Sequence, residues 1–271
     1  MKSFAASLIV LLGCLPLACE ENTDSLELPY QERLVINGYL QVQPSLEQII
    51  HVSRTLPLNE NNSSDKGIVR NAQVFLQFGD TVRQLMYEDD QYHIDGISIF
   101  AGRVYTVTVE WNGKRAWANT LAPFPPFIDT VIVGRHNTLD GPVYTAEALV
   151  TPHTGEIYMP IWDFASNDTL FTLISQTQGP LTAEDVAEDG CIHFRFVFRL
   201  PSAPGPFEHL LFTCYSYDRP YYDYYISRGD PGFSGVPTYS YFTGPVRWNV
   251  QGEGIGLFVG QAMNVRVGIL P

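Results

Sequence analysis

The feature that most constrains the fold is a series of short runs in which β-branched or aromatic residues alternate with polar ones. Val104–Trp111 is the clearest of these runs. Side chains alternate across a β-strand, so the pattern predicts strands with one buried face. Gly79-Asp80 and Asn112-Gly113 separate neighbouring runs, and both pairs favour hairpin turns. The other predicted strands are 34–42, 49–54, 72–78, 82–87, 92–94, 115–120, 128–133, 143–151, 157–164, 170–176, 192–200, 209–217, 255–259 and 263–270.

The composition agrees with an all-β, mainly β, protein. The chain has 22 Gly, 19 Pro, 15 Tyr and 16 Phe, and 45% of its residues are hydrophobic while 17% are charged. Such a chain can bury a core and is unlike a disordered one. Helices are expected to be short. The Thr182–Asp185 capping box predicts a helical turn or two through Ala187, whereas Tyr221–Arg228 fits either a strand or a helix.

A proline-rich segment, Ala122–Phe127, interrupts the series of strands. Three prolines in five residues cannot pair centrally in a sheet, so the segment is expected to be a stiff, extended linker over 122–127. We therefore predict two β-sandwich-like domains in tandem. The first is an immunoglobulin-like sandwich over 33–121, and the second is a β-rich domain over 128–271 with one or two short helices.

The N-terminus has the pattern of an export signal. Lys2 precedes an apolar run over 4–13, small residues lie beside Cys14 and Cys19, and acidic residues follow at once. The run is too short to remain as a membrane span. A signal of this kind with a cysteine at its end is typical of bacterial lipoproteins, so 1–18 is predicted to be a lipoprotein signal peptide.

Two cysteines compete as the acylated residue. Leu11–Cys14 is the better lipobox taken alone, but cleavage there would shorten the apolar core of the signal. We therefore favour Cys19, which leaves an acidic tether over 19–32. Cys14 and ordinary secretion without lipid remain the alternatives. The acyl group is the predicted attachment to the membrane.

The charge of the chain argues against one class of partner. The formal net charge is −13, and a chain this acidic repels phosphate backbones. No nucleic acid partner is therefore expected.

Beyond the signal, the chain has two cysteines, Cys191 and Cys214. Exported proteins often form disulfides. Strand alternation places Cys214 on the core side with Leu210 and Phe212, and places Cys191 on the face opposite the phenylalanines of its strand. The two thiols are therefore expected to point in opposite directions and to stay unpaired.

A search for catalytic chemistry finds no specific pattern. The six histidines are scattered without a second ligand at metal-binding spacing. Two acidic clusters, 88–90 and 184–189, match no calcium loop and are better explained as solvated turns. No nucleophile elbow, phosphate loop or dinucleotide fingerprint occurs. No catalytic residue, metal or cofactor is predicted, and the protein is expected not to be an enzyme.

The one surface that suggests a binding role is aromatic. Tyrosines, Phe242 and a tryptophan crowd into the segment between Tyr215 and Trp248. Their rings suit protein partners, peptides or stacking on sugars. The competing interpretation is that they fill a β core. The predicted binding residues are Tyr221, Tyr222, Tyr224, Tyr225 and Trp248.

Several segments, taken in order, resemble a known family. They are the acidic run after Cys19, Leu34–Tyr39, Tyr105–Val109, Tyr221–Tyr225 and Asn249–Phe258. Together they resemble domain-of-unknown-function family 4249 of outer-membrane lipoproteins from Bacteroidota. The chain departs from the pattern at Pro16 and Glu253. The family carries no catalytic residues to transfer.

The resemblance implies a context. Such lipoproteins tend to be encoded near TonB-dependent receptors, and acidic residues after the anchor are associated with surface display. We therefore expect a surface-exposed outer-membrane lipoprotein that serves a TonB-dependent transporter as an accessory or ligand-capture partner. The alternatives are a structural surface protein, such as an adhesin or fimbria-like subunit, and a glycan-binding or glycan-degrading protein.

Overall fold

The computed structural model describes residues 30–42, 47–57, 64–166, 169–173, 180–200, 209–227 and 245–271. Residues Arg33–Pro271 form one compact unit, and the description below concerns that unit. The predicted signal peptide, Cys14, Cys19 and most of the predicted tether lie outside the described residues. Strands dominate the described chain, which confirms the all-β prediction.

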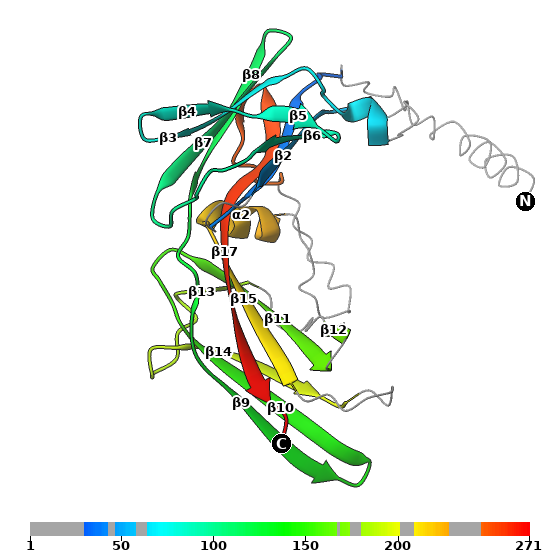
Figure 1. The fold of residues 1–271 in the computed structure, drawn as a ribbon, viewed down its shortest axis with the longest axis vertical. Coiled ribbons are helices and arrows are strands. Elements are labelled where there is room, and N and C mark those ends of the chain that lie inside the picture. Colours follow the sequence, from blue (N-terminus) through cyan, green and yellow to red (C-terminus); the bar gives the residue numbers. More distant parts are fainter. Residues whose placement is uncertain are drawn as a thin grey trace, which may run out of the picture. The chain divides into compact units, whose positions relative to one another are not determined.

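One long sheet runs through the unit (Figure 1). Its strands follow the order β12-β11-β15-β17-β1-β2-β6-β5, and β13 pairs with β11. We call it the main sheet. Its strands are β1 (Leu34–Gln41), β2 (Gln48–Arg54), β5 (Met86–Glu88), β6 (Gln91–Ile94), β11 (Ile157–Ser166), β12 (Thr169–Leu173), β13 (Leu181–Thr182), β15 (His209–Tyr217) and β17 (Gly254–Ile269).

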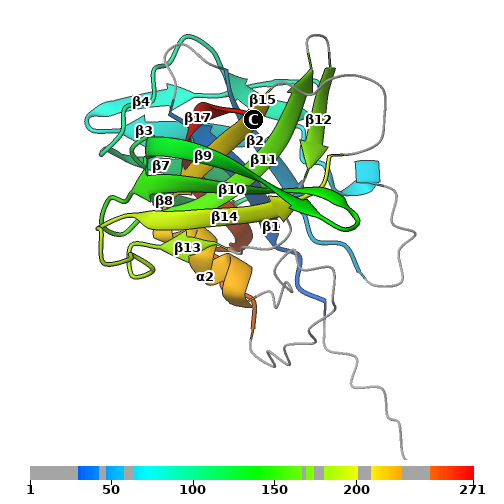
Figure 2. The same cartoon turned by 90° about the horizontal axis from the view of Figure 1, so that it is seen from below.

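Two smaller sheets complete the strands (Figure 2). The first has the order β16-β8-β7-β3-β4, and the second has the order β14-β10-β9. Short helices are the 3-10 turn η2 (Ser64–Gly67) and α2 (Arg219–Ser227). The strands are β3 (Gln73–Phe78), β4 (Thr81–Gln84), β7 (Val104–Trp111), β8 (Lys114–Leu121), β9 (Phe127–Thr138), β10 (Gly141–Thr151), β14 (Ile192–Phe198) and β16 (Gln251–Gly252).

Each small sheet buries one face against part of the main sheet, which gives two hydrophobic cores. The first core joins β1 and β2 to β3, β7 and β8, through residues such as Ile36 and Val107. The second joins β11 and β15 to β10 and β14 around Trp162, whose ring lies 4.5 Å from that of Phe212. This arrangement agrees with the predicted sandwich-like packing.

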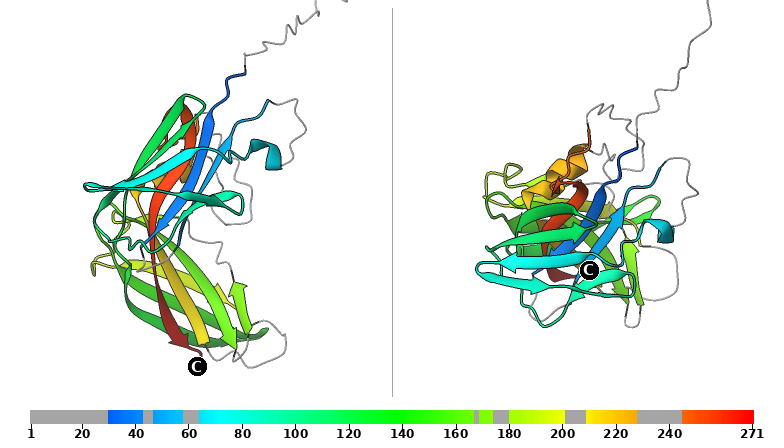
Figure 3. Two further views of the ribbon diagram at one scale, coloured as in Figure 1. Left: turned by 45° about the horizontal axis from the view of Figure 1, so that its top comes forward. Right: turned by 90° about the horizontal axis from the view of Figure 1, so that it is seen from above.

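Strand β17 contributes to both halves of the unit. Its residues Gly254–Gln261 pair in parallel with β1, and Gln261–Ile269 pair antiparallel with β15 (Figure 3). The two strands predicted at 255–259 and 263–270 are therefore one continuous strand. Phe258 belongs to the first core although it lies within 128–271, the range predicted for the second domain. The division of the chain into one domain over 33–121 and another over 128–271 stays a prediction.

Both predicted hairpin turns are confirmed. Asn112 and Gly113 join β7 to β8 with φ values of +48° and +76°. Positive φ at both central residues matches the right-handed twist of a hairpin, which explains why asparagine and glycine suit these positions. Gly79, at φ +53°, begins the turn between β3 and β4.

The helix predicted at 182–187 is wrong. The Asp185 carboxylate does accept hydrogen bonds from the Thr182 N–H (2.7 Å) and hydroxyl (3.1 Å), as a capping box suggests. The chain nevertheless makes a tight turn there. A second turn follows directly, in which the Gly190 N–H donates to the Ala187 carbonyl, and it leads into β14. The alternative left open for 221–228 resolves as a helix: α2 covers Arg219–Ser227.

The prediction of no disulfide is confirmed. Cys191 and Cys214 are both free. Cys214 is fully buried in the second core, whereas Cys191 lies on the opposite face of β14, near Asp129.

The proline-rich segment is extended and is held by side chains rather than by a sheet. The Phe124 N–H donates to the Glu156 carboxylate (2.6 Å), and the Ser216 hydroxyl donates to the Phe124 carbonyl (2.6 Å). The Asn264 amide donates to the Pro126 carbonyl (3.0 Å). These bonds satisfy backbone groups that prolines and their neighbours cannot satisfy in a ladder.

Candidate functional site

Helix α2 lies on the face of the main sheet that points away from the two cores, which we call the outer face. Asp218 precedes the helix, and its carboxylate accepts the Arg219 N–H (2.8 Å). Pro220 follows in the first turn, where a missing N–H costs nothing. The helix packs tyrosines on a third cluster that includes Ile157, Leu257 and Val259.

A row of tyrosine rings runs from the sheet onto α2. Tyr217 stacks on Tyr221 with ring centroids 4.0 Å apart and an interplanar angle of 11°. Tyr39 meets the edge of Tyr217 at 6.4 Å, and Tyr225 follows Tyr221 at 6.3 Å. Burial raises the pKa of Tyr217, so its hydroxyl stays protonated and accepts the Gln261 amide at 3.2 Å.

The five predicted binding residues fall into two groups. Tyr221 and Tyr225 belong to the tyrosine row, and Tyr225 is buried. Tyr224 lies 5.3 Å from Trp248, which is 40% exposed, and Tyr222 lies under the Arg219 guanidinium at 4.9 Å. Tyr221, Tyr222 and Tyr224 are half-buried against the third cluster. Packing accounts for much of the described part of this aromatic segment, whereas Phe242 lies outside the described residues. The role of the five residues in binding stays a prediction.

Trp248 and its neighbours line a cavity of about 550 Å³ beside α2. Arg33, Asp223 and Arg247 contribute its charged groups. The Arg247 N–H donates to the Ser227 hydroxyl at 2.8 Å, which fixes the chain next to the end of the helix. The cavity is of a size that small ligands occupy.

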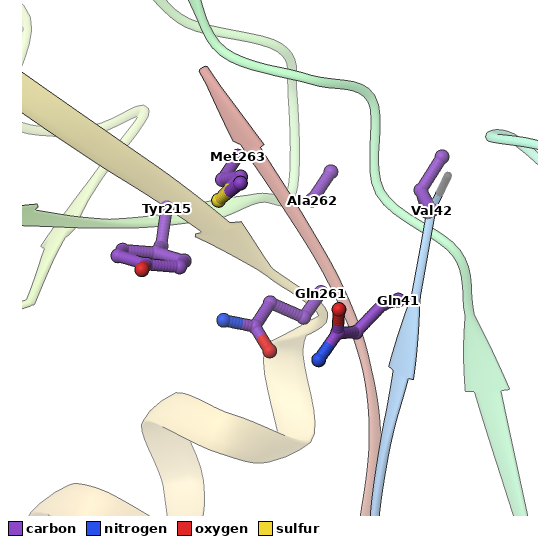
Figure 4. A pocket seen from close by; sticks show the side chains of 6 residues that line it. All are labelled: Gln41, Val42, Tyr215, Gln261, Ala262 and Met263. Atoms are coloured by element: carbon purple, nitrogen blue, oxygen red, sulfur yellow. The ribbon is translucent and has the colours of Figure 1, made fainter. Parts of the chain in front are cut away.

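A second hollow lies where β1 ends and β17 continues (Figure 4). It measures about 160 Å³. The Val42 N–H donates to the Gln261 carbonyl at 2.8 Å, which is the last bond of the β1–β17 pairing. We call it the β1/β17 hollow. Its lining residues are Gln41, Val42, Tyr215, Gln261, Ala262 and Met263.

The side chains around this hollow combine a ring with amides. Gln41 and Gln261 are direct neighbours in the parallel register, and Figure 4 shows their amides beside each other with the Tyr215 ring across from them. The Gln48 side chain holds the Gln41 backbone at 2.8 and 3.2 Å. Such a set can hydrogen-bond a peptide or a sugar while the ring offers an apolar face.

Exposed apolar residues continue from the hollow along the outer face. Met263 lines the hollow, Tyr39 lies two positions before Gln41 on β1, and Val265 and Val267 follow Met263 at alternate positions of β17. Exposed apolar residues gathered on one face are typical of an interaction surface. The sequence did not reveal these residues as a surface, because alternation shows which strand residues share a face and does not show which face stays uncovered.

The family model Domain of unknown function (DUF4249) matches residues 21–261. The chain belongs to the DUF4249 family. No curated protein matches it. A solved chain described as "Cytokine receptor complex - Crystal form 1A" is similar at 13% identity and a TM-score of 0.26, covering 69% of this chain and 86% of that one.

The DUF4249 chain also carries a charged cluster on β10 and β14. His193 lies between the carboxylates of Glu147 (2.8 Å) and Asp189 (2.9 Å), and Arg195 donates to Glu147 at 2.7 Å. Hydrogen bonds to Glu147 and Asp189 raise the pKa of His193. Burial raises the pKa of the Cys191 thiol, which disfavours a reactive thiolate. This arrangement is that of an ion-pair network.

Within the described part of the DUF4249 chain, no three histidine, cysteine or acidic side chains converge to hold a metal ion. No described helix is both long and apolar enough to cross a membrane.

Proposed function

We propose that this DUF4249 member is a non-catalytic, surface-exposed lipoprotein of the outer membrane, anchored through an acylated Cys19. In this proposal it serves a TonB-dependent transporter as an accessory or ligand-capture partner. The observation that carries the proposal is the exposed apolar surface around the β1/β17 hollow. Membership of the DUF4249 family supports the resemblance that was found in the sequence. The outer-membrane location and the transporter are what that resemblance implies.

The chemistry of the hollow fits capture rather than turnover. Gln41 and Gln261 offer neutral donors and acceptors, and Tyr215 offers a ring, but the hollow has no acid, base or nucleophile among its lining residues. A receptor loop or a sugar-like ligand can use both features. The ring with two amides also favours glycan binding as the second candidate.

Co-purification tests the proposal directly. The full chain is tagged at the C-terminus, native outer membranes are solubilised in mild detergent, and co-purifying proteins are identified by mass spectrometry. We expect a TonB-dependent receptor in an amount close to that of the tagged protein. Recovery of the tagged protein alone contradicts the proposal and favours a structural surface protein.

Matched variants test the surface. Tyr39→Lys and Met263→Lys each place a charge beside the hollow, and we expect the recovered receptor to fall about tenfold, which corresponds to ~1.4 kcal/mol of binding energy. Val197→Lys is the control, because Val197 is also apolar and exposed (66%, against 45% for Tyr39 and 42% for Met263) but lies on β14. Equal loss with all three variants, or loss with none, contradicts the assignment of the docking surface.

A further inference from the structure

Strand β17 changes partner along its length, which leaves part of each edge without a neighbouring strand. Up to Gln261 one edge pairs with β1, and from Gln261 the other edge pairs with β15. The edge that β1 leaves, from Met263 to Ile269, has no paired strand among the described residues. We call it the free edge.

The opposite edge of β17, beside residues 254–260, is covered by side chains and by α2. The Asn249 amide bonds both the N–H (2.9 Å) and the carbonyl (2.6 Å) of Phe258, as a neighbouring strand would. The Gly260 N–H donates to the Thr120 hydroxyl (2.6 Å), and the Asp218 N–H donates to the Gly260 carbonyl (3.3 Å). This edge is therefore closed to a further strand.

Among the described residues, one backbone group of the free edge has a hydrogen-bond partner on that edge. Backbone groups point to the two edges alternately, and the Gln261 carbonyl points to β1. The groups of Met263, Val265, Val267 and Ile269 therefore point to the free edge. The Val265 N–H donates to the Asn264 side chain at 2.8 Å. Within the described ranges, the other N–H and carbonyl groups of these residues have no partner on this edge.

The side chains along the free edge are apolar and uncharged on the outer face. Val265, Val267 and Ile269 are 44%, 53% and 76% exposed. The segment Gly254–Pro271 contains no acidic residue, although the chain has 29 Asp and Glu and a net charge of −13. Two copies can therefore approach at this edge without the repulsion that the rest of the chain imposes.

We propose that the free edge of β17 pairs antiparallel with the free edge of a second copy of this chain, about a two-fold axis at Val267. In this register Val267 lies opposite Val267 of the second copy, and Val265 lies opposite Ile269. These hydrogen-bonded pairs exchange about six backbone bonds. The pairing replaces the Asn264–Val265 bond by a backbone bond, and it extends the main sheet across the axis.

The sequence of the strand favours this register and this partner. On the other face, Arg266 is exposed and lies opposite Gly268, against which Val131 and Val133 of β9 pack. A register centred on Arg266 would instead oppose two arginines, which is unfavourable. The same apolar residues thus match themselves across a two-fold axis, which is the requirement for an isologous interface.

Cysteine cross-linking of the full chain in native membranes tests the pairing. Hydrogen-bonded residues of antiparallel strands have Cα atoms about 5.5 Å apart, within the range that a disulfide bridges. With Val267→Cys, mild oxidation is expected to give a species of twice the monomer mass on a non-reducing gel. Val197→Cys is the control, because Val197 is 66% exposed and lies on β14.

Charge substitutions in the Val267→Cys background test the register. Val265→Lys with Ile269→Lys opposes like charges and should lower the dimer fraction about tenfold. Val265→Lys with Ile269→Glu opposes unlike charges and should restore it, which a general loss of stability would not do. A dimer fraction no higher than that of Val197→Cys, equal effects of both charge pairs, or cross-links only to a different protein would overturn the proposal.

Discussion

At the scale of single residues, Glu156 shows how the proline-rich segment is held. Its side chain is buried, with the residue 5% exposed, and it accepts hydrogen bonds from the Phe124 N–H (2.6 Å) and the Tyr158 hydroxyl (2.9 Å). Burial raises the pKa of Glu156, and the two hydrogen bonds oppose this increase. The carboxylate is therefore needed as an acceptor but is costly to ionise.

The raised pKa predicts a direction of pH dependence. An acid whose pKa is higher in the folded protein binds more protons when folded, so its contribution to stability decreases as pH rises above its ordinary value of 4.5. We expect the unfolding free energy to fall more between pH 4.5 and pH 7 in the wild type than in Glu156→Gln, measured by urea denaturation. Glu156→Ala removes the acceptor and should cost about 2–4 kcal/mol at pH 7.

The exposed acid Glu110 supplies the control. Glu110→Gln also replaces an acid by its amide, but at an exposed position, so a change in the pH profile seen only with Glu156→Gln is due to the buried site. Identical pH profiles for the wild type and Glu156→Gln would show that burial does not penalise this carboxylate.

At the scale of elements, α2 is attached to β8 by a small polar network. The Asp218 carboxylate accepts the Thr120 hydroxyl (3.0 Å) and the Leu121 N–H (2.8 Å) in addition to capping the helix. Thr120 is buried and also accepts the Gly260 N–H. One pair of side chains thus joins α2, β8 and β17.

A double-mutant cycle measures this connection. Asp218→Ala and Thr120→Val should each destabilise the protein by about 1–3 kcal/mol, because each leaves a buried polar group without its partner. The double variant should be more stable than the sum predicts by about 0.5–2 kcal/mol. Additive effects in urea denaturation would mean that the two residues act independently.

The elements that could be predicted from the sequence are those whose structure depends on residues within one short segment. The hairpin at Asn112-Gly113 depends on two residues that tolerate positive φ, and β7 follows from alternation within one segment. The helix at 182–187 failed, because its capping bonds form in a tight turn as readily as in a helix. The helix α2 had a local signal that was overlooked, namely Asp218 followed by Pro220.

The candidate surfaces depend on pairing between distant segments and were less predictable. Trp248 and the tyrosines of α2 were identified from composition alone. The β1/β17 hollow was not, because Gln41 and Gln261 become neighbours only through a parallel pairing that no local pattern specifies. The free edge is hidden for the same reason: the residues Met263–Ile269 look like any other strand.

At the scale of the whole molecule, the proposed anchor is tested by location. Cys19→Ala is expected to move the protein from the membrane to the soluble fraction, because burial of acyl chains supplies ~0.8 kcal/mol per CH₂ group. Cys14→Ala should leave the protein in the membrane fraction, measured by fractionation and immunoblotting. If the Cys14→Ala protein is found in the soluble fraction and the Cys19→Ala protein stays in the membrane fraction, Cys14 is the acylated residue instead.

The pairing of β1 with β17 has a consequence for how the chain folds. Leu34 pairs with Gly254, 220 positions further along the chain, and Val250 and Phe258 complete the first core. Bringing such distant segments together costs loop-closure entropy and slows folding. A chain synthesised from its N-terminus cannot finish its first sandwich until Gly254–Gln261 have been made. The strands of the first sandwich that are made early therefore wait, without their full core, while the residues between β1 and β17 are synthesised.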